Sequence, residues 1–216
     1  MIRKIKNMVW NGLNFTAIGP LLQLYMVGEI KTNGWMKSFA TKKAVDRNNN
    51  PIPWWTYPMV DFLKERLNAS IIIFEYGCGG STKWLANKVG HITSLEDHKE
   101  WMEFVKSDMP NNTTLIYQPI DELESYSKAI QRDNTKYNFI IVDGKERNQC
   151  VTHCLGNLSE DGIILLDDSF RTEYTVSIEL LKQKGFKKLD FWGMVPVVPA
   201  KSCTSIFYRK DNILGL

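Results

Sequence analysis

Short apolar runs alternate with segments of helical spacing over most of the chain from residue 70 onward. Three of the runs are continuously apolar and rich in β-branched residues: 71–74, 139–142 and 163–166. Continuous apolar runs of this length are typical of strands that are buried on both faces of a sheet. Because such strands alternate with helical segments, the pattern predicts an α/β fold with a mostly parallel sheet and helices on both of its faces.

The predicted sheet has seven strands, and its last two strands follow one another without a helix between them. The strands are expected at 71–75, 91–96, 113–118, 137–144, 162–169, 187–194 and 203–210. The helices are expected at 81–89, 98–109, 121–132, 146–158 and 172–184. A proline-containing loop at 195–202 joins the final two strands, so the last strand is expected to run antiparallel to its neighbours.

The first sixty residues differ from the rest of the chain. We expect residues 1–60 to form an N-terminal helical and aromatic arm, with the sheet domain at 61–216. This part ends in an aromatic group, Trp54, Trp55 and Tyr57. Sugar rings often pack on aromatic faces, so a lid over a binding site is one interpretation. Apolar packing on the domain is the interpretation that we favour.

Three basic residues, Arg3, Lys4 and Lys6, precede a mostly apolar stretch at 8–30. Polar residues and the pair Gly19-Pro20 interrupt this stretch, which argues against a signal peptide and against a membrane span. Two interpretations remain. The segment forms short helices that pack on the domain or on a second subunit of a homodimer, which we favour, or it is a basic amphipathic segment that lies on an anionic membrane surface.

Composition and charge narrow the possible partners. A chain of 216 residues fits one domain with appendages. The net charge of +3 indicates no concentrated basic face, so nucleic acid is not expected as a partner. Cys78, Cys150, Cys154 and Cys203 form no C-x-x-C framework, which favours a reducing, cytoplasmic environment. Cys150, His153 and Cys154 are expected to share a half-buried helix face rather than to bind a metal.

The richest local pattern follows the first strand, where Glu75 precedes a glycine-rich turn with Gly77 and Gly79. Ser81 and Thr82 then open a helical segment. Such a turn lets a ligand approach the backbone closely, and the start of the helix offers unpaired N–H groups. The acid at the strand end suits a ligand with hydroxyls or a cationic amine, rather than a bare phosphate.

Carboxylates also follow the other well-defined strands. They are Glu96 with Asp97, Asp143, and Asp167 with Asp168. Ligands of open α/β sheets bind beyond the carboxyl ends of the strands, so we expect these acids to gather at one edge. Several like charges raise one another's pKa unless cations or hydrogen bonds offset them. Glu96 is placed to accept hydrogen bonds from ribose hydroxyls, and Asp97 is expected to cap the helix at 98–109.

The stretch from Glu75 to Thr82 resembles motif I of the class I S-adenosylmethionine-dependent methyltransferases, acid-x-Gly-x-Gly-x-Gly. Glu75, Gly77 and Gly79 match, and Ser81 occupies the place of the third glycine. The resemblance implies a Rossmann-like seven-stranded sheet and S-adenosylmethionine as the cofactor. The cofactor-binding residues that it implies are Glu75, Gly77, Cys78, Gly79, Ser81, Thr82 and Glu96. The glycine spacing argues against NAD, because Thr82 occupies the third-glycine position of G-x-G-x-x-G.

The acids after the fourth and fifth predicted strands are similar to those of the cation-dependent, catechol-type O-methyltransferases. That resemblance implies that Asp143, Asp167 and Asp168 hold Mg²⁺, with Asp168 in place of the family's asparagine. A bound cation would lower the pKa of an acceptor hydroxyl. In the alternative without a metal, Asp143 or Asp168 acts as the general base.

The segments 142–150 and 165–174 resemble a bacterial subgroup of methyltransferases associated with surface glycans, over roughly residues 50–210. The resemblance implies an enzyme that methylates a hydroxyl of a sugar or glycan intermediate. From the cysteines and the basic N-terminal segment, we expect it to be cytoplasmic or peripheral to the inner membrane. Arg147 and Arg171 flank the acids, either to contact an anionic substrate or to form ion pairs with those acids. An NAD- or nucleotide-binding Rossmann protein and a non-catalytic interaction protein of the same fold remain as alternatives.

Overall fold

Seven strands form one sheet in the computed structural model, which describes residues 2–216. The strands are β1 (Ile72–Tyr76), β2 (His91–Glu96), β3 (Thr113–Tyr117), β4 (Tyr137–Val142), β5 (Leu158–Leu166), β6 (Lys187–Met194) and β7 (Lys201–Tyr208). Their order in the sheet is β3-β2-β1-β4-β5-β7-β6. The first five pair in parallel, and β7 runs antiparallel to both β5 and β6. The predicted Rossmann-like sheet is thereby confirmed.

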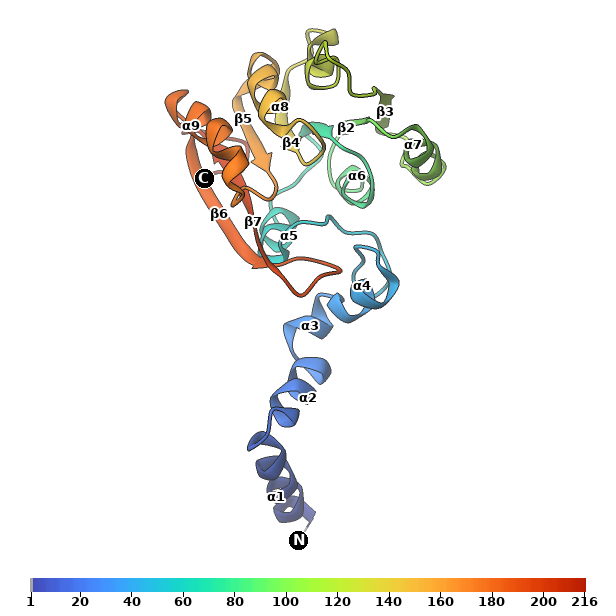
Figure 1. The fold of residues 1–216 in the computed structure, drawn as a ribbon, viewed down its shortest axis with the longest axis vertical. Helices are drawn as coiled ribbons and strands as arrows, with labels where there is room; N and C mark the ends of the chain where they lie inside the picture. Colours follow the sequence, from blue (N-terminus) through green and yellow to red (C-terminus); the bar gives the residue numbers. More distant parts are fainter. Residues whose placement is uncertain (1) are drawn as a thin grey trace.

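Helices cover both faces of this sheet (Figure 1). They are α1 (Ile2–Asn14), α2 (Ile18–Met26), α3 (Glu29–Thr32), α4 (Trp35–Thr41), α5 (Tyr57–Lys64), α6 (Gly80–Ala86), α7 (Lys99–Lys106), α8 (Arg147–Cys154) and α9 (Thr175–Gln183). Three 3₁₀ helices add η1 (Ser127–Arg132), η2 (Leu155–Asn157) and η3 (Thr172–Tyr174). Side chains of α5 and α6 pack in one core cluster with the strands, and those of α8, α9 and η1 pack in the other.

Alternate residues of the central strands feed these two cores. Ile73 and Ile141 point into the core below α5 and α6, whereas Phe74 and Ile140 point into the core below α8 and α9. This alternation follows from the two-residue period of a strand. Both faces are buried, which explains why the central strands are continuously apolar in sequence.

One predicted helix is largely absent. The helix expected at 121–132 is limited to the short 3₁₀ helix η1. The reason is local, because the Asp121 carboxylate accepts hydrogen bonds from the backbone N–H groups of Leu123 and Ser125. An aspartate that satisfies nearby backbone donors in this way competes with helix formation.

The helices α1 to α3 project away from the domain, at the blue end of the chain in Figure 1. In α1 no residue is buried, and in α2 only Gly19 is buried. The favoured prediction that these helices pack on the domain is therefore wrong for α1 and α2, and packing on a second subunit stays a prediction. Among residues 2–216, no helix is long and apolar enough to cross a membrane.

The chain joins the domain well before residue 60, where the arm was expected to end. The Trp35 indole N–H donates to the carbonyl oxygen of Val198 at 3.2 Å, which ties α4 to the loop between β6 and β7. Ile52 and Trp55 are buried, and Trp55 packs in the core with the strands. The favoured packing of Trp55 on the domain is thus confirmed. Its neighbour Trp54 is 47% exposed.

The sheet changes direction between β1 and β4, which are neighbours although two strands separate them in sequence. Open α/β sheets bind ligands at such a switch point, beyond the carboxyl ends of the strands. The turn after β1 lies there against the turn after β4. Their approach is so close that a Cβ on Gly144 would overlap the Tyr126 hydroxyl and lie 3.0 Å from the Tyr76 backbone.

We therefore predict that Gly144→Ala lowers the free energy of unfolding by about 1–3 kcal/mol, as overpacked sites typically do. Gly156→Ala is the matched control, because a Cβ there meets no atom within 4 Å. Urea denaturation of both variants measures the difference. Equal stabilities would show that the two turns can move apart.

Candidate functional site

The turn after β1 is built around the carboxylate of Glu75. This side chain is 1% exposed and accepts hydrogen bonds from three hydroxyls, at 2.5 Å from Ser81, 2.5 Å from Thr82 and 2.7 Å from Ser94. Gly77 follows with φ of +106°, a conformation that favours glycine. The carboxylate thus ties β1 to β2 and to the first turn of α6.

The two hydroxyl residues explain why a serine stands here where the resembled motif has its third glycine. Ser81 occupies the third-glycine position and uses its hydroxyl to reach Glu75. Thr82 donates to the same carboxylate and accepts from the backbone N–H of Gly79 at 2.9 Å. Glu75 therefore holds the turn, one of the two roles that the resemblance implies. Burial raises its pKa to about 7, although the three hydroxyls act in the opposite direction.

Glu96 organises the other side of the turn from the end of β2. Its carboxylate accepts from the backbone N–H of Cys78 at 3.2 Å and of His98 at 3.0 Å. Each oxygen keeps capacity for a further donor. The Trp101 indole N–H donates to the Cys78 carbonyl at 2.9 Å and so covers the turn. The cap of α7 is the His98 side chain, which accepts from the Trp101 backbone, so the predicted cap Asp97 is wrong.

A cavity of about 280 Å³ opens between these turns. Its lining residues are Glu75, Gly77, Cys78, Ser81, Glu96, Asp97, Asp143, Gly144, Lys145 and Arg147. Five of the seven predicted cofactor-binding residues line it, and the other two, Gly79 and Thr82, support the turn from behind. Of the three predicted acids after β4 and β5, only Asp143 reaches this lining.

Arg147, the first residue of α8, holds the ends of β4 and β5 together. Its guanidinium donates to three backbone carbonyls, those of Gly144 at 3.0 Å, Asp143 at 2.9 Å and Asp167 at 2.6 Å. It also pairs with the carboxylates of Asp143 at 3.1 Å and Asp167 at 3.9 Å. The side chain is only 12% exposed. Two roles were predicted for Arg147, contact with an anionic substrate and ion pairing with the acids, and the ion pairs are present in the structure.

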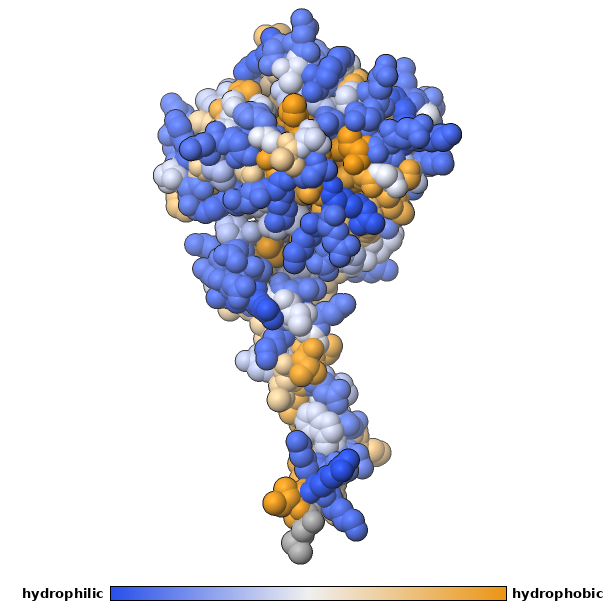
Figure 2. Space-filling model, turned by 180° about the vertical axis from the view of Figure 1, so that it is seen from behind, coloured by the Kyte–Doolittle hydropathy of each residue, from blue (hydrophilic) through white to orange (hydrophobic). Residues whose placement is uncertain are grey.

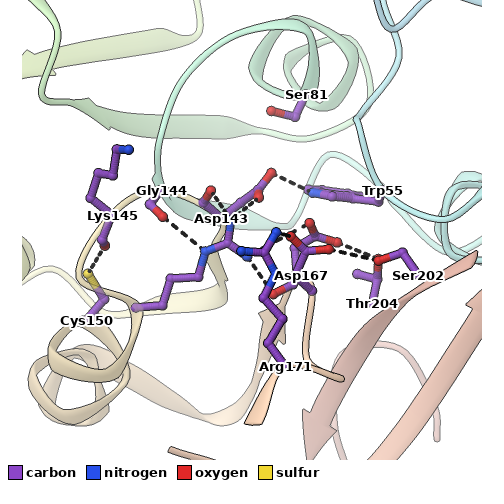
Figure 3. Close-up of polar contacts among 12 residues, drawn as sticks. Trp55, Ser81, Asp143, Gly144, Lys145, Cys150, Asp167, Arg171, Ser202 and Thr204 are labelled. Atoms are coloured by element: carbon purple, nitrogen blue, oxygen red, sulfur yellow. Dashed lines mark hydrogen bonds and ion pairs between the residues drawn. The ribbon is translucent and has the colours of Figure 1, made fainter. Parts of the chain in front are cut away.

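Asp143 is held from two sides. One carboxylate oxygen pairs with Arg147, and the other accepts from the Trp55 indole N–H at 3.0 Å (Figure 3). Burial raises the pKa of Asp143, and the hydrogen bond from Trp55 and the charge of Arg147 offset part of that increase. The side chain remains 23% exposed, on the cavity side.

Asp167 and Asp168 are engaged by other side chains and do not line the cavity. The Asp167 carboxylate accepts from the Thr204 hydroxyl at 2.6 Å, and burial raises its pKa well above the usual range. Asp168 accepts from the Ser202 hydroxyl at 2.8 Å and pairs with Arg171 at 2.5 Å. Figure 3 shows Asp167 on the side of Thr204, away from Gly144.

The predicted Mg²⁺ site is consequently not formed. Within residues 2–216, no group of three His, Cys, Asp or Glu side chains is arranged to hold a metal ion. The physical reason is Arg147, whose cationic group already pairs with both Asp143 and Asp167. The residues present therefore do not fit Mg²⁺. Cys150 and Cys154 are buried in the core, consistent with the expected helix face.

Sequence reasoning missed two contributors to the site. Trp55 lies 88 residues from Asp143 in sequence, and nothing local in the sequence indicates that its indole N–H reaches that carboxylate. Lys145 lines the cavity, and its place directly after the strand-four acid and glycine was the available signal.

No protein-family model matches the chain, and no curated protein matches it in sequence. Solved structures match it in fold. Precorrin-6y C5,15-methyltransferase from Geobacter metallireducens GS-15 has a TM-score of 0.57 at 15% identity, over 71% of this chain and 87% of that one. An rRNA methylase from Streptococcus thermophilus has a TM-score of 0.54 at 14% identity, over 70% and 96%.

A candidate methyltransferase from Streptococcus mutans, in complex with S-adenosylhomocysteine, has a TM-score of 0.50 at 13% identity, over 68% of this chain and 94% of that one. At these identities the likeness establishes the fold alone. The fold that the chain shares with these three proteins is a seven-stranded Rossmann-like sheet.

The raised pKa of Glu75 predicts a specific pH dependence of stability. Its value of about 7 in the fold lies above the usual 4.5, so the folded state binds the proton more tightly than the unfolded chain. This contribution is complete below pH 4.5 and is lost as the pH rises through 7, by up to about 3 kcal/mol.

Urea denaturation across this pH range compares the protein with Glu75→Gln, which cannot titrate. The wild-type free energy of unfolding should fall more steeply with pH than that of the variant. The exposed Glu160→Gln is the control and should retain the wild-type profile. Parallel curves for wild type and Glu75→Gln would contradict the prediction.

Proposed function

We propose that this chain is an S-adenosylmethionine-dependent methyltransferase that acts on a hydroxyl of a sugar or glycan intermediate. The observation that carries the proposal is the shared cavity at the switch point. The glycine turn after β1, the acid Glu96 after β2 and the acid Asp143 after β4 all line it. A cofactor site and a candidate general base thus meet in one space.

The polar groups of the cavity suit this cofactor. The backbone at Gly77 and Cys78 allows close approach of the methionine end, and Glu96 has free acceptor capacity for ribose hydroxyls. The sulfonium of the cofactor is cationic, and Asp143 beside the glycine turn supplies negative charge near it. Transfer of the methyl group makes the sulfur neutral, so this attraction weakens as the product forms.

Asp143 is the residue that we assign as the general base. The acceptor oxygen forms a bond to the methyl carbon while the carbon–sulfur bond breaks and its electron pair remains on sulfur. The hydroxyl proton passes to the Asp143 carboxylate, whose raised pKa makes it a stronger base than a solvated aspartate. Trp55 and Arg147 fix its orientation. Asp168 is a weaker candidate, because Arg171 and Ser202 engage it outside the cavity lining.

Support for a sugar acceptor comes from the resemblance to glycan-associated methyltransferases and from Trp54. This side chain is 47% exposed, directly before the buried Trp55 that contacts Asp143. An exposed aromatic side chain directly before the residue that binds the proposed base is suited to packing against a sugar ring.

Calorimetric titration tests the cofactor assignment. We expect S-adenosylmethionine and S-adenosylhomocysteine to bind and NAD not to bind. Glu96→Gln should weaken the binding of S-adenosylhomocysteine by roughly 10- to 100-fold, because a hydrogen bond to a charged acceptor is lost. Glu100→Gln, on the exposed side of α7, is the control and should bind normally. Binding of NAD alone would refute the proposal.

The hydrogen bond from Trp55 predicts a second effect, on catalysis. Trp55→Phe keeps most of the packing but removes the donor that lowers the pKa of Asp143. With an active acceptor, kcat should fall roughly tenfold, and the acidic limb of the pH profile of kcat/KM should move to higher pH. Trp54→Phe is the control. An unchanged acidic limb in Trp55→Phe would show that Asp143 is not the base.

A further inference from the structure

From here on, the name arm is used only for residues 2–28, the part of the N-terminal segment that projects from the domain. The arm exposes large apolar side chains along its whole length. Those more than half exposed are Ile2, Ile5, Met8, Val9, Phe15, Ile18, Leu21, Tyr25, Met26 and Val27. Figure 2 shows apolar side chains at the surface of this projecting part, beside hydrophilic ones. So many exposed apolar side chains within one short segment indicate an interaction site.

The helix α1 separates most of its apolar residues from its polar ones, and Lys6 lies at the boundary beside Ile2 and Leu13. At 3.6 residues per turn, one face carries Ile2, Ile5, Met8, Val9 and Leu13. The opposite face carries Arg3, Lys4, Asn7, Asn11 and Asn14. The apolar face is unpartnered, because no residue of α1 is buried. A helix with this division, and with cations on its polar face, is typical of segments that lie in a membrane interface.

The helix α2 differs, because it is apolar on all sides. Gln23 is its only polar side chain. A helix partner would cover one stripe of such a surface, whereas lipid can cover the whole of it. Its nine residues extend only about 13 Å, far less than the roughly 30 Å of a bilayer core. The arm is therefore suited to lying in one leaflet and not to crossing the membrane.

The positive charge of the arm favours an anionic lipid surface over a second copy of the arm as its partner. Residues 2–28 contain the cations Arg3, Lys4 and Lys6 and no acidic residue, the first acid being Glu29. A second arm would bring more positive charge and no carboxylate, whereas an anionic lipid surface supplies the opposite charge. Trp10 and Tyr25 add the aromatic residues that favour the headgroup region.

We propose that the arm docks on the surface of an anionic lipid bilayer, with the apolar face of α1 turned inward and α2 immersed beside it. The basic residues of α1 then lie at the level of the lipid headgroups. The sheet domain is held at the membrane by a projecting segment that makes little contact with it, so docking leaves the cavity at the switch point uncovered.

Flotation of the full chain with vesicles tests this proposal. We expect it to float with vesicles of equal parts phosphatidylglycerol and phosphatidylcholine. Vesicles of phosphatidylcholine alone should bind it on the order of a hundredfold more weakly, because three basic residues lose their lipid partners. Ile5→Gln with Val9→Gln should reduce binding to the anionic vesicles on the order of a hundredfold, because two inward-facing apolar side chains are lost.

The matched control is Asn7→Gln with Asn11→Gln, which introduces the same residue twice on the polar face of the same helix and should bind like wild type. Sedimentation velocity without lipid measures the oligomeric state in parallel. Absence of flotation, equal loss in the two paired variants, or equal binding to both vesicle types would overturn the proposal. A lipid-free dimer that the Ile5 and Val9 changes dissociate would assign the face to a second copy instead.

Discussion

The acid-rich edge of the sheet depends on the hydrogen bonds and ion pairs of the Arg147 guanidinium. Parallel strands that end in carboxylates bring like charges together, and without a cation or donors each would raise the pKa of the others. Arg147, in the first turn of α8, supplies the cation that offsets this repulsion. It donates to three backbone carbonyls and pairs with Asp143 and Asp167. The planar group with its five donors suits such a crowded site better than a lysine would. It also supplies positive charge to two of the carboxylates for which the catechol-type resemblance implied a metal.

A second internal network supports the side of the cavity that is proposed to bind the cofactor. Glu75 binds three hydroxyls and so fixes the glycine turn before any ligand arrives, while Glu96 fixes the backbone at Cys78. Both networks satisfy buried carboxylates with partners from the chain itself, which keeps the cavity preformed. The site proposed for catalysis is therefore rigid on its β1 and β4 sides, and Asp143 is the acid that the networks leave partly exposed to the cavity.

The sheet could be predicted from sequence because the signal is local: strands buried on both faces are apolar without interruption. The acids that follow these strands then lie at one edge, because the strands are parallel. Prediction from sequence failed where the structure depends on contacts between distant residues or on competing hydrogen bonds. The turn at Asp121 replaced an expected helix because a side chain took the backbone donors. The Mg²⁺ prediction failed because sequence shows Arg147 near the acids but not the direction of its side chain. Trp55 was recognised as a packing residue, yet its hydrogen bond to Asp143 depends on the fold.

We infer that a cofactor site and an arginine-held base share one cavity without a metal. A crystal structure with S-adenosylhomocysteine, grown in Mn²⁺ as an anomalous substitute for Mg²⁺, distinguishes this arrangement from a metal site. We expect the ribose on Glu96, the sulfur between the Gly77 turn and Asp143, and no anomalous peak at Asp143, Asp167 or Asp168. A manganese peak among those three carboxylates with Arg147 displaced, or S-adenosylhomocysteine bound outside this cavity, would contradict it.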